Sequence, residues 1–82
     1  MLTVKDKMTL DFEARHWKYP GVKETQIRDL FTESATRYYQ RLNHLIDQPA
    51  ALDYDPMLVK RLQRMRTQRA RRRTAIATGF EI

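Results

Sequence analysis

The sequence predicts an all-α protein, a small four-helix domain that contains a helix-turn-helix and ends in a basic helix or arm. Apolar residues recur at helical spacing along most of the chain, capping residues precede several of these segments, and alternating β-branched runs are absent. The 82 residues make one domain without cysteine, so packed helices must supply its core. We expect a helical domain over residues 1–65, with the helix-turn-helix at 23–47, and a basic arm and tail over 66–82.

The first helix is expected from about Val4 to Lys18, because Thr3 followed by Asp6 is typical of a helix start. Its apolar side chains recur at helical spacing and are expected inward: Val4, Met8 and Phe12, with Leu10 and Trp17 on a neighbouring face. We expect the segment 19–21, Tyr-Pro-Gly, to end this helix.

The second and third helices are expected from about Lys23 to Phe31 and from Ala35 to about Asp47, with Ser34 as the cap between them. The apolar spacing places two groups of side chains inward: Ile27, Leu30 and Phe31 on the second helix, and Tyr38, Leu42, Leu45 and Ile46 on the third. Pro49 is expected to stop the third helix.

A short connector with Leu52 and Tyr54 is expected to lead to the last helix, which Asp55-Pro56 should begin. This helix should bury one apolar stripe: Leu58, Val59, Leu62 and Met65. After that stripe ends, the run 66–73 has no core-facing side. We expect it to project as a helical or frayed arm that orders on a partner.

Positive charge is concentrated in the last third of the chain. The net charge is +6, but residues 1–55 carry −1 and residues 56–82 carry +7. Such a segregated charge creates a local positive field, and arginine predominates in it, which favours forked contacts to phosphate. The composition therefore predicts a nucleic-acid partner.

The segment 26–45 has the spacing of a helix-turn-helix, with Ile27 and Phe31 on one helix, Ser34 in the turn, and Tyr38 and Leu42 on the next. The side chains expected to point outward and contact base edges are Ala35, Thr36, Tyr39, Gln40 and Asn43. Three positions depart from the usual pattern, which has a small residue in place of Arg28, glycine in place of Thr32 and an apolar residue in place of Glu33.

Phosphate contacts are expected from two groups of cationic side chains. Arg37, Arg41 and His44 follow one flank of the third helix. The second group lies in the basic segment: Lys60, Arg61, Arg64, Arg66, Arg69, Arg71, Arg72 and Arg73.

Residues from about 10 to 73 resemble a family of short actinobacterial and actinobacteriophage proteins classified as a domain of unknown function. The stretches that carry the resemblance are WKY (17–19), Gly21 with KE (23–24), SATRYYQRLN (34–43), LID (45–47) and DPMLVKRL (55–62). The resemblance implies a helix-turn-helix fold and no established activity.

Plainer structural roles compete for several of these residues. Phe12 and Trp17 are expected in the core, whereas Tyr39 suits a partner contact and a half-covered surface position equally well. The acids Asp11, Glu13, Glu24 and Asp29 are expected on solvated helix faces. With no activated nucleophile, no phosphate-binding glycine loop and no clustered metal ligands in the pattern, we expect no enzymatic activity, cofactor or metal.

The sequence therefore predicts a transcriptional regulator or DNA-organising protein that binds double-stranded DNA. We expect it in the cytoplasm, associated with the nucleoid, or in the host cytoplasm if the protein is viral. Apolar runs are too short for a membrane segment. The alternatives are an RNA-binding or ribosome-associated protein, and a module that docks on host transcription machinery through an acidic partner. We expect a possible homodimer, because one copy contacts only a few base pairs and a second copy would lengthen the recognised site. The pattern leaves open the target sequence, activation or repression, oligomeric state, DNA or RNA, and host or viral origin.

Overall fold

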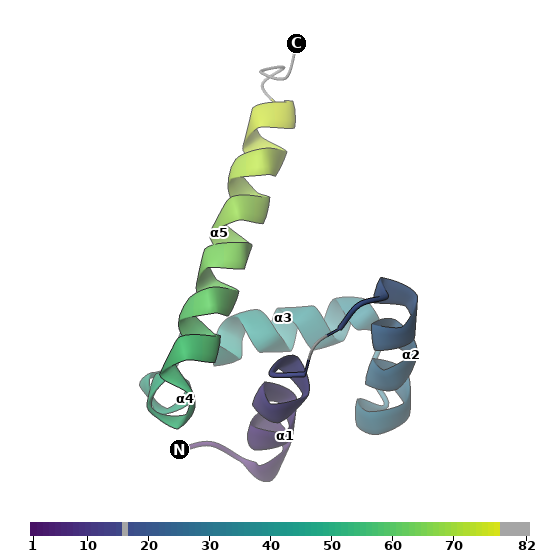
Figure 1. The fold of residues 1–82 in the computed structure, drawn as a ribbon, viewed down its shortest axis with the longest axis vertical. Helices are drawn as coiled ribbons and strands as arrows, with labels where there is room; N and C mark the ends of the chain where they lie inside the picture. Colours follow the sequence, from purple (N-terminus) through teal and green to yellow (C-terminus); the bar gives the residue numbers. More distant parts are fainter. Residues whose placement is uncertain (16, 78–82) are drawn as a thin grey trace.

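The structure, a computed structural model, describes residues 1–15 and 17–77, with side chains up to residue 72. The described residues form helices and no strand, which confirms the all-α class. The elements are α1 (Val4–Glu13), α2 (Pro20–Phe31), α3 (Ala35–Leu45), α4 (Pro49–Tyr54) and α5 (Pro56–Ala77). α3 runs between α2 and the foot of α5, and the distal part of α5 projects away from the other helices (Figure 1).

α1 begins as expected but ends before Lys18. Thr3 and Asp6 form a capping box, in which each side chain accepts a hydrogen bond from the other residue's backbone N–H. The helix ends at Glu13, because the Phe12 carbonyl oxygen accepts hydrogen bonds from the Arg15 N–H at 3.3 Å and the Trp17 indole N–H at 2.8 Å. The chain therefore turns so that Trp17 lies against Phe12.

Two prolines that were expected to end helices instead begin them. Pro20 is the first residue of α2, so this helix starts three residues before Lys23. Pro49 is the first residue of α4, a six-residue helix in the segment expected to be a connector. Both positions suit proline, because the first helical residue has no intrahelical use for its N–H. α3 ends at Leu45, two residues before Asp47.

The turn between α2 and α3 contains a residue in an unusual backbone conformation. Thr32 ends α2 with φ 55° and ψ 37°, the left-handed region that glycine favours. Ser34 then caps α3, its side chain accepting a hydrogen bond from the Arg37 N–H at 3.2 Å. The position where a helix-turn-helix commonly has glycine thus adopts the glycine-like conformation.

α5 continues as one helix from Pro56 through the basic run to Ala77. Asp55 caps it as expected, with its carboxylate accepting from the Leu58 N–H at 3.3 Å. The helix passes residue 65 without interruption, so the run 66–73 is helical rather than frayed. The side chain of Arg73 and the tail 78–82 lie outside the described residues.

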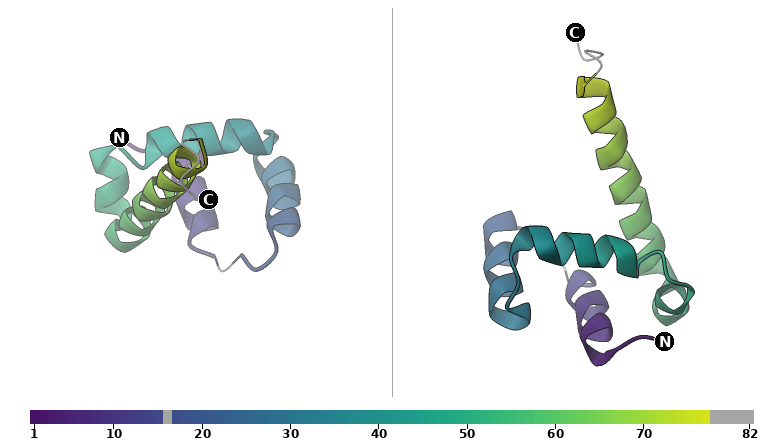
Figure 2. Two further views of the ribbon diagram at one scale, coloured as in Figure 1. Left: turned by 90° about the horizontal axis from the view of Figure 1, so that it is seen from above. Right: turned by 180° about the vertical axis from the view of Figure 1, so that it is seen from behind.

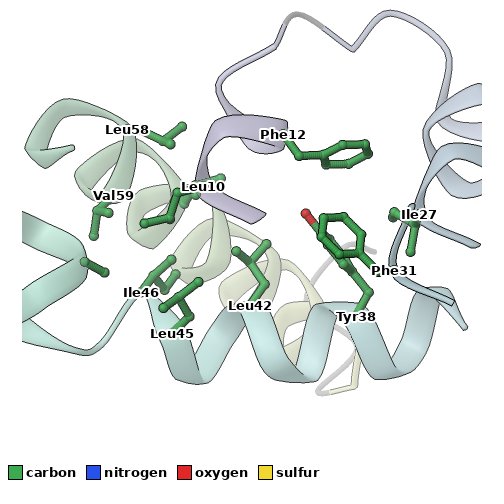
Figure 3. Close-up of a cluster of buried hydrophobic side chains, with 12 residues drawn as sticks. Leu10, Phe12, Ile27, Phe31, Tyr38, Leu42, Leu45, Ile46, Leu58 and Val59 are labelled. Carbon is green, nitrogen blue, oxygen red and sulfur yellow. The ribbon is translucent and has the colours of Figure 1, made fainter. Parts of the chain in front are cut away.

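The core lies where α3 meets α1 and α5, and its α3 side chains point toward α1 (Figure 3). The expected inward residues of α3 are confirmed as buried: Tyr38, Leu42, Leu45 and Ile46 at its C-terminal end. The same holds for Leu10, Phe12, Ile27, Phe31, Leu58, Val59 and Leu62. Four residues expected inward are instead exposed: Val4 (74%), Met8 (43%), Leu30 (44%) and Met65 (39%).

α1 is rotated away from its apolar stripe because its polar side chains have partners inside the domain. Thr9 and Glu13 are buried beside Leu10 and Phe12. The Arg41 guanidinium donates to the Thr9 hydroxyl at 2.9 Å, and Lys23 and Tyr38 donate to the Glu13 carboxylate. The expectation that Glu13 lies on a solvated face is therefore wrong. These bonds offset the cost of burying polar groups.

Candidate nucleic-acid interface

One side of α3 is open to solvent. Thr36, Gln40 and Asn43 are exposed, while Ala35 is half-buried. They lie opposite the buried stripe of Tyr38, Leu42 and Leu45, as the period of a helix requires. Within residues 1–15 and 17–77, the three polar side chains are left exposed and available to a partner.

Tyr39 lies at the border between this open side and the core. It is half-buried, with its ring edge-on to Tyr38 at 5.1 Å between centroids. The Lys23 ammonium group lies 5.3 Å from the centre of the Tyr39 ring. Tyr39 therefore packs against α2 and keeps part of its surface free.

The cationic flank of α3 is divided in two. Arg37 and His44 are exposed, whereas Arg41 turns inward. Its guanidinium forms three hydrogen bonds of 2.8–3.2 Å to the Glu33 carboxylate and lies 5.3 Å from the Phe31 ring centre. These hydrogen bonds, with the charges of Arg41 and Lys5, hold the pKa of Glu33 below its ordinary value. The Arg41 guanidinium is occupied within the domain.

Arg66 joins α5 to the C-terminal end of α3. Its guanidinium donates to the Asn43 carbonyl oxygen at 3.0 Å and forms an ion pair of 2.8 Å with Asp47. Hydrogen bonding lowers the pKa of Asp47 and raises that of Arg66. Gln63, one turn earlier, donates to the Ile46 carbonyl oxygen at 2.8 Å. These bonds fix the angle at which α5 leaves the body.

The cations of α5 lie on two sides of the helix. Lys60, Arg64 and Arg71 border a shallow hollow of about 460 Å³, together with the polar side chains Gln63, Thr67 and Gln68. Arg61, Arg66 and Arg69 occupy the other side, which continues the buried stripe of Leu58 and Leu62. We call the first three the far-face cations. Arg72 is exposed near the end of the described side chains.

Residues of four helices line two adjoining hollows on the body side of α5. The smaller hollow, of about 30 Å³, lies between α3 and α5. Its own lining residues are Tyr39, Leu42, Asn43, Ile46, Arg66 and Arg69, and four further residues line both hollows. The shared residues are Glu13, Lys23, Leu62 and Met65, and the second hollow, of about 210 Å³, adds Arg15, Trp17 and Arg61. We call the two hollows together the cationic groove. Its lining residues come from helices that the ribbon views place around α3, which runs between α2 and the foot of α5 (Figures 1 and 2).

Charge in the cationic groove is predominantly positive. Five cations line it, and Glu13 is the acidic side chain among the described residues that do so. The Glu13 carboxylate is buried and accepts from Lys23 at 3.0 Å and from the Tyr38 hydroxyl. Burial and the neighbouring Glu13 carboxylate raise the pKa of Tyr38, so this hydroxyl keeps its proton. Among the described ion pairs, Lys23 balances Glu13 and Arg66 balances Asp47, so Arg15, Arg61 and Arg69 supply the excess positive charge of the groove.

The sequence did not predict the part of the groove formed by Arg15, Trp17 and Lys23. These residues lie in and after the turn that joins α1 to α2, more than thirty positions before α5. Their charge is balanced locally by the acids of residues 1–55, so no run of like charge marks them. The one sequence feature that could have indicated this part of the groove is the pair of cations, Arg15 and Lys23, on either side of the α1–α2 turn.

Among the described residues, no cluster of three or more potential metal ligands is found. Within the same part of the chain, no helix has the length and apolar character needed to cross a membrane.

Over the described residues the fold defines a small all-α domain, with five helices, one core and a cationic groove. Over residues 1–74 the sequence matches the family described as "Protein of unknown function (DUF3263)", and the chain belongs to this family. No curated protein and no solved structure matches it. The expected membership in a domain of unknown function is thus confirmed, while the helix-turn-helix and the actinobacterial or viral origin stay predictions.

Proposed function

We propose that the protein binds double-stranded DNA, with α3 in the major groove and the body-side arginines of α5 on the phosphate backbone. The observation that carries this proposal is the hollow shared by the two helices. Tyr39 and Asn43 of α3 line it together with Arg66 and Arg69 of α5. One polyanion can therefore contact the edge of α3 and the basic helix at the same time.

The segment α2–turn–α3 supports the helix-turn-helix interpretation. Its turn is three residues long, with Thr32 in the left-handed conformation and Ser34 as the cap. Ile27 and Phe31 of α2 are buried with Tyr38 of α3, which locks the two helices together. Such packing leaves the opposite side of α3 free to enter a groove, where Gln40 and Asn43 suit adenine edges and Thr36 suits a thymine methyl group.

The proposed phosphate contacts are a subset of the cations that the sequence suggested. Arg37 and His44 flank the open side of α3, and Arg61, Arg66, Arg69 and Arg72 follow α5. Arg41 is omitted because the largely buried Glu33 holds its guanidinium, whereas Asp47, the partner of Arg66, is exposed. The far-face cations are omitted because they do not line the cationic groove; Arg64 instead lines a separate hollow with Arg61 and Ala14 at the foot of α5.

Titration of duplex DNA at increasing salt tests this function. If about six phosphates are neutralised, log affinity should fall against log salt with a slope near −5. Replacing Gln40 and Asn43 together by alanine should remove sequence preference and retain most of that slope, because phosphate contacts carry no base information. A preference that survives this double variant would contradict the assignment of α3.

Structured RNA is the necessary competitor in the same titration. Arginine-rich helices bind RNA without a base-contacting α3, so RNA that displaces duplex DNA at equal concentration would favour the RNA-binding alternative. A selected duplex that resists displacement by RNA supports the DNA assignment.

A further inference from the structure

The end of the cationic groove at the foot of α5 lies beyond the α3 residues assigned to base contacts and includes one proposed phosphate contact, Arg61. This end is the hollow of about 210 Å³ bordered by Arg15, Trp17 and Arg61. We propose that it holds an unpaired strand of nucleic acid, with Arg15 and Arg61 on its phosphates and one base against Trp17. The proposal rests on the proposed function for the adjoining duplex, from which that strand would continue.

The size of the hollow favours a single strand over a duplex. Sites for drug-sized molecules span about 300–1,000 Å³. A hollow of about 210 Å³ is smaller and admits one base or a phosphate with part of its sugar. A double helix is far too wide to enter between α5 and the turn that follows α1.

The charges of this end are available to an anion. The ion pairs of the described side chains involve neither Arg15 nor Arg61, and both residues are exposed. The Arg61 guanidinium donates to the Glu13 carbonyl oxygen at 3.4 Å, which ties it to the end of α1. The nearby Glu13 carboxylate is bound to Lys23 and Tyr38 and does not compensate these two charges.

Trp17 supplies a fixed aromatic surface beside these arginines. Its indole N–H donates to the Phe12 carbonyl oxygen at 2.8 Å, and its ring lies 4.5 Å from the Phe12 ring centre. The side chain is half-buried, and its remaining surface lines the hollow. A positive groove combined with a held aromatic ring is the arrangement that binds single strands through backbone contacts and base stacking.

Trp17 is also the single tryptophan of the chain, so fluorescence excited selectively at tryptophan reports on this end of the groove. The experiment compares three probes: a blunt duplex, the same duplex with a short unpaired overhang at either end, and the unpaired strand alone. We expect the overhang to quench Trp17 emission and to tighten binding about tenfold over the blunt duplex.

The double variant Arg15→Gln/Arg61→Gln should lose both the quenching and the gain from the overhang. Its matched control is Lys60→Gln/Arg71→Gln, which removes the same charge from the far face of α5 and should keep both effects. Circular dichroism verifies that each variant is folded. An overhang that adds neither affinity nor quenching, or an equal loss in the two double variants, overturns the proposal.

Failure of the proposed function gives a different result. If the blunt duplex does not bind while the unpaired strand quenches Trp17, the duplex assignment fails and the single-strand site stands. If the blunt duplex binds with the expected salt dependence and the overhang has no effect, the single-strand site fails and the duplex assignment stands.

Discussion

At the scale of single residues, two departures from the usual helix-turn-helix pattern have a physical explanation. Glu33 stands where an apolar residue is common, and its carboxylate is largely buried against Arg41, with Lys5 3.5 Å away. Thr32 stands where glycine is common and adopts the left-handed conformation. The sequence marks both positions as departures from the helix-turn-helix pattern, but the ion pair that Glu33 makes could not be inferred from local spacing.

Arg41 is expected to stabilise the fold rather than contact a partner. Replacing it by glutamine would leave the Glu33 carboxylate without its main donor and remove the hydrogen bond to Thr9. Breaking a buried ion pair costs roughly 3–5 kcal/mol, and partial exposure of this one reduces our expectation to about 2 kcal/mol. Urea unfolding measures the change. The control Arg37→Gln, at an exposed position of the same helix, should stay within about 0.5 kcal/mol of wild type.

The same ion pair predicts a loss of stability in acid. The pKa of Glu33 is lowered in the folded state, so folding favours the charged carboxylate. Its contribution is present above the ordinary value of 4.5 and is lost as pH falls through the lower folded value. Urea midpoints measured between neutral pH and pH 3 should fall less steeply for Glu33→Gln than for wild type. Equally steep curves would contradict this role.

At the scale of elements, the accuracy of the sequence prediction depended on whether a helix buries apolar or polar side chains. α3 and the first half of α5 bury apolar side chains, and their periods gave the correct inward faces except at Met65. α1 buries Thr9 and Glu13 through partners 32 and 25 positions away, Arg41 and Tyr38. Local hydrophobic period contains no information on such distant bonds, so Val4 and Met8 were wrongly placed inward.

The α2–α3 turn provides a test at this scale. A threonine in the left-handed region costs about 1–2 kcal/mol, while glycine loses about 0.5–1 kcal/mol more backbone entropy on folding. Thr32→Gly should therefore raise the free energy of unfolding by about 0.5 kcal/mol. The same substitution four residues later, Thr36→Gly, should lower it by a few tenths of a kcal/mol because that residue is helical. Thermal unfolding of both variants tests the turn, and destabilisation by Thr32→Gly would count against the left-handed conformation.

At the scale of the whole molecule, Glu13 links four helices. It belongs to α1, its carboxylate accepts from Lys23 of α2 and Tyr38 of α3, and its carbonyl oxygen accepts from Arg61 of α5. These hydrogen bonds hold the basic helix α5 beside the turn after α1, and the cationic groove lies between them. The charge asymmetry of the sequence predicted the arginines of α5, but the residues that complete the groove became evident only from the fold.

At this scale, the proposed DNA binding requires one polyanion that contacts both α3 and the body side of α5. Arg69 and Arg71 test it most directly, because both are exposed cations of the same helix and lie on different sides of it. The measurement is the slope of log affinity against log salt for one duplex. Arg69→Gln should make the slope shallower by about 0.9, the value for one phosphate contact, and Arg71→Gln should leave it unchanged. Equal changes in the two variants, or a larger change for Arg71→Gln, would contradict the account.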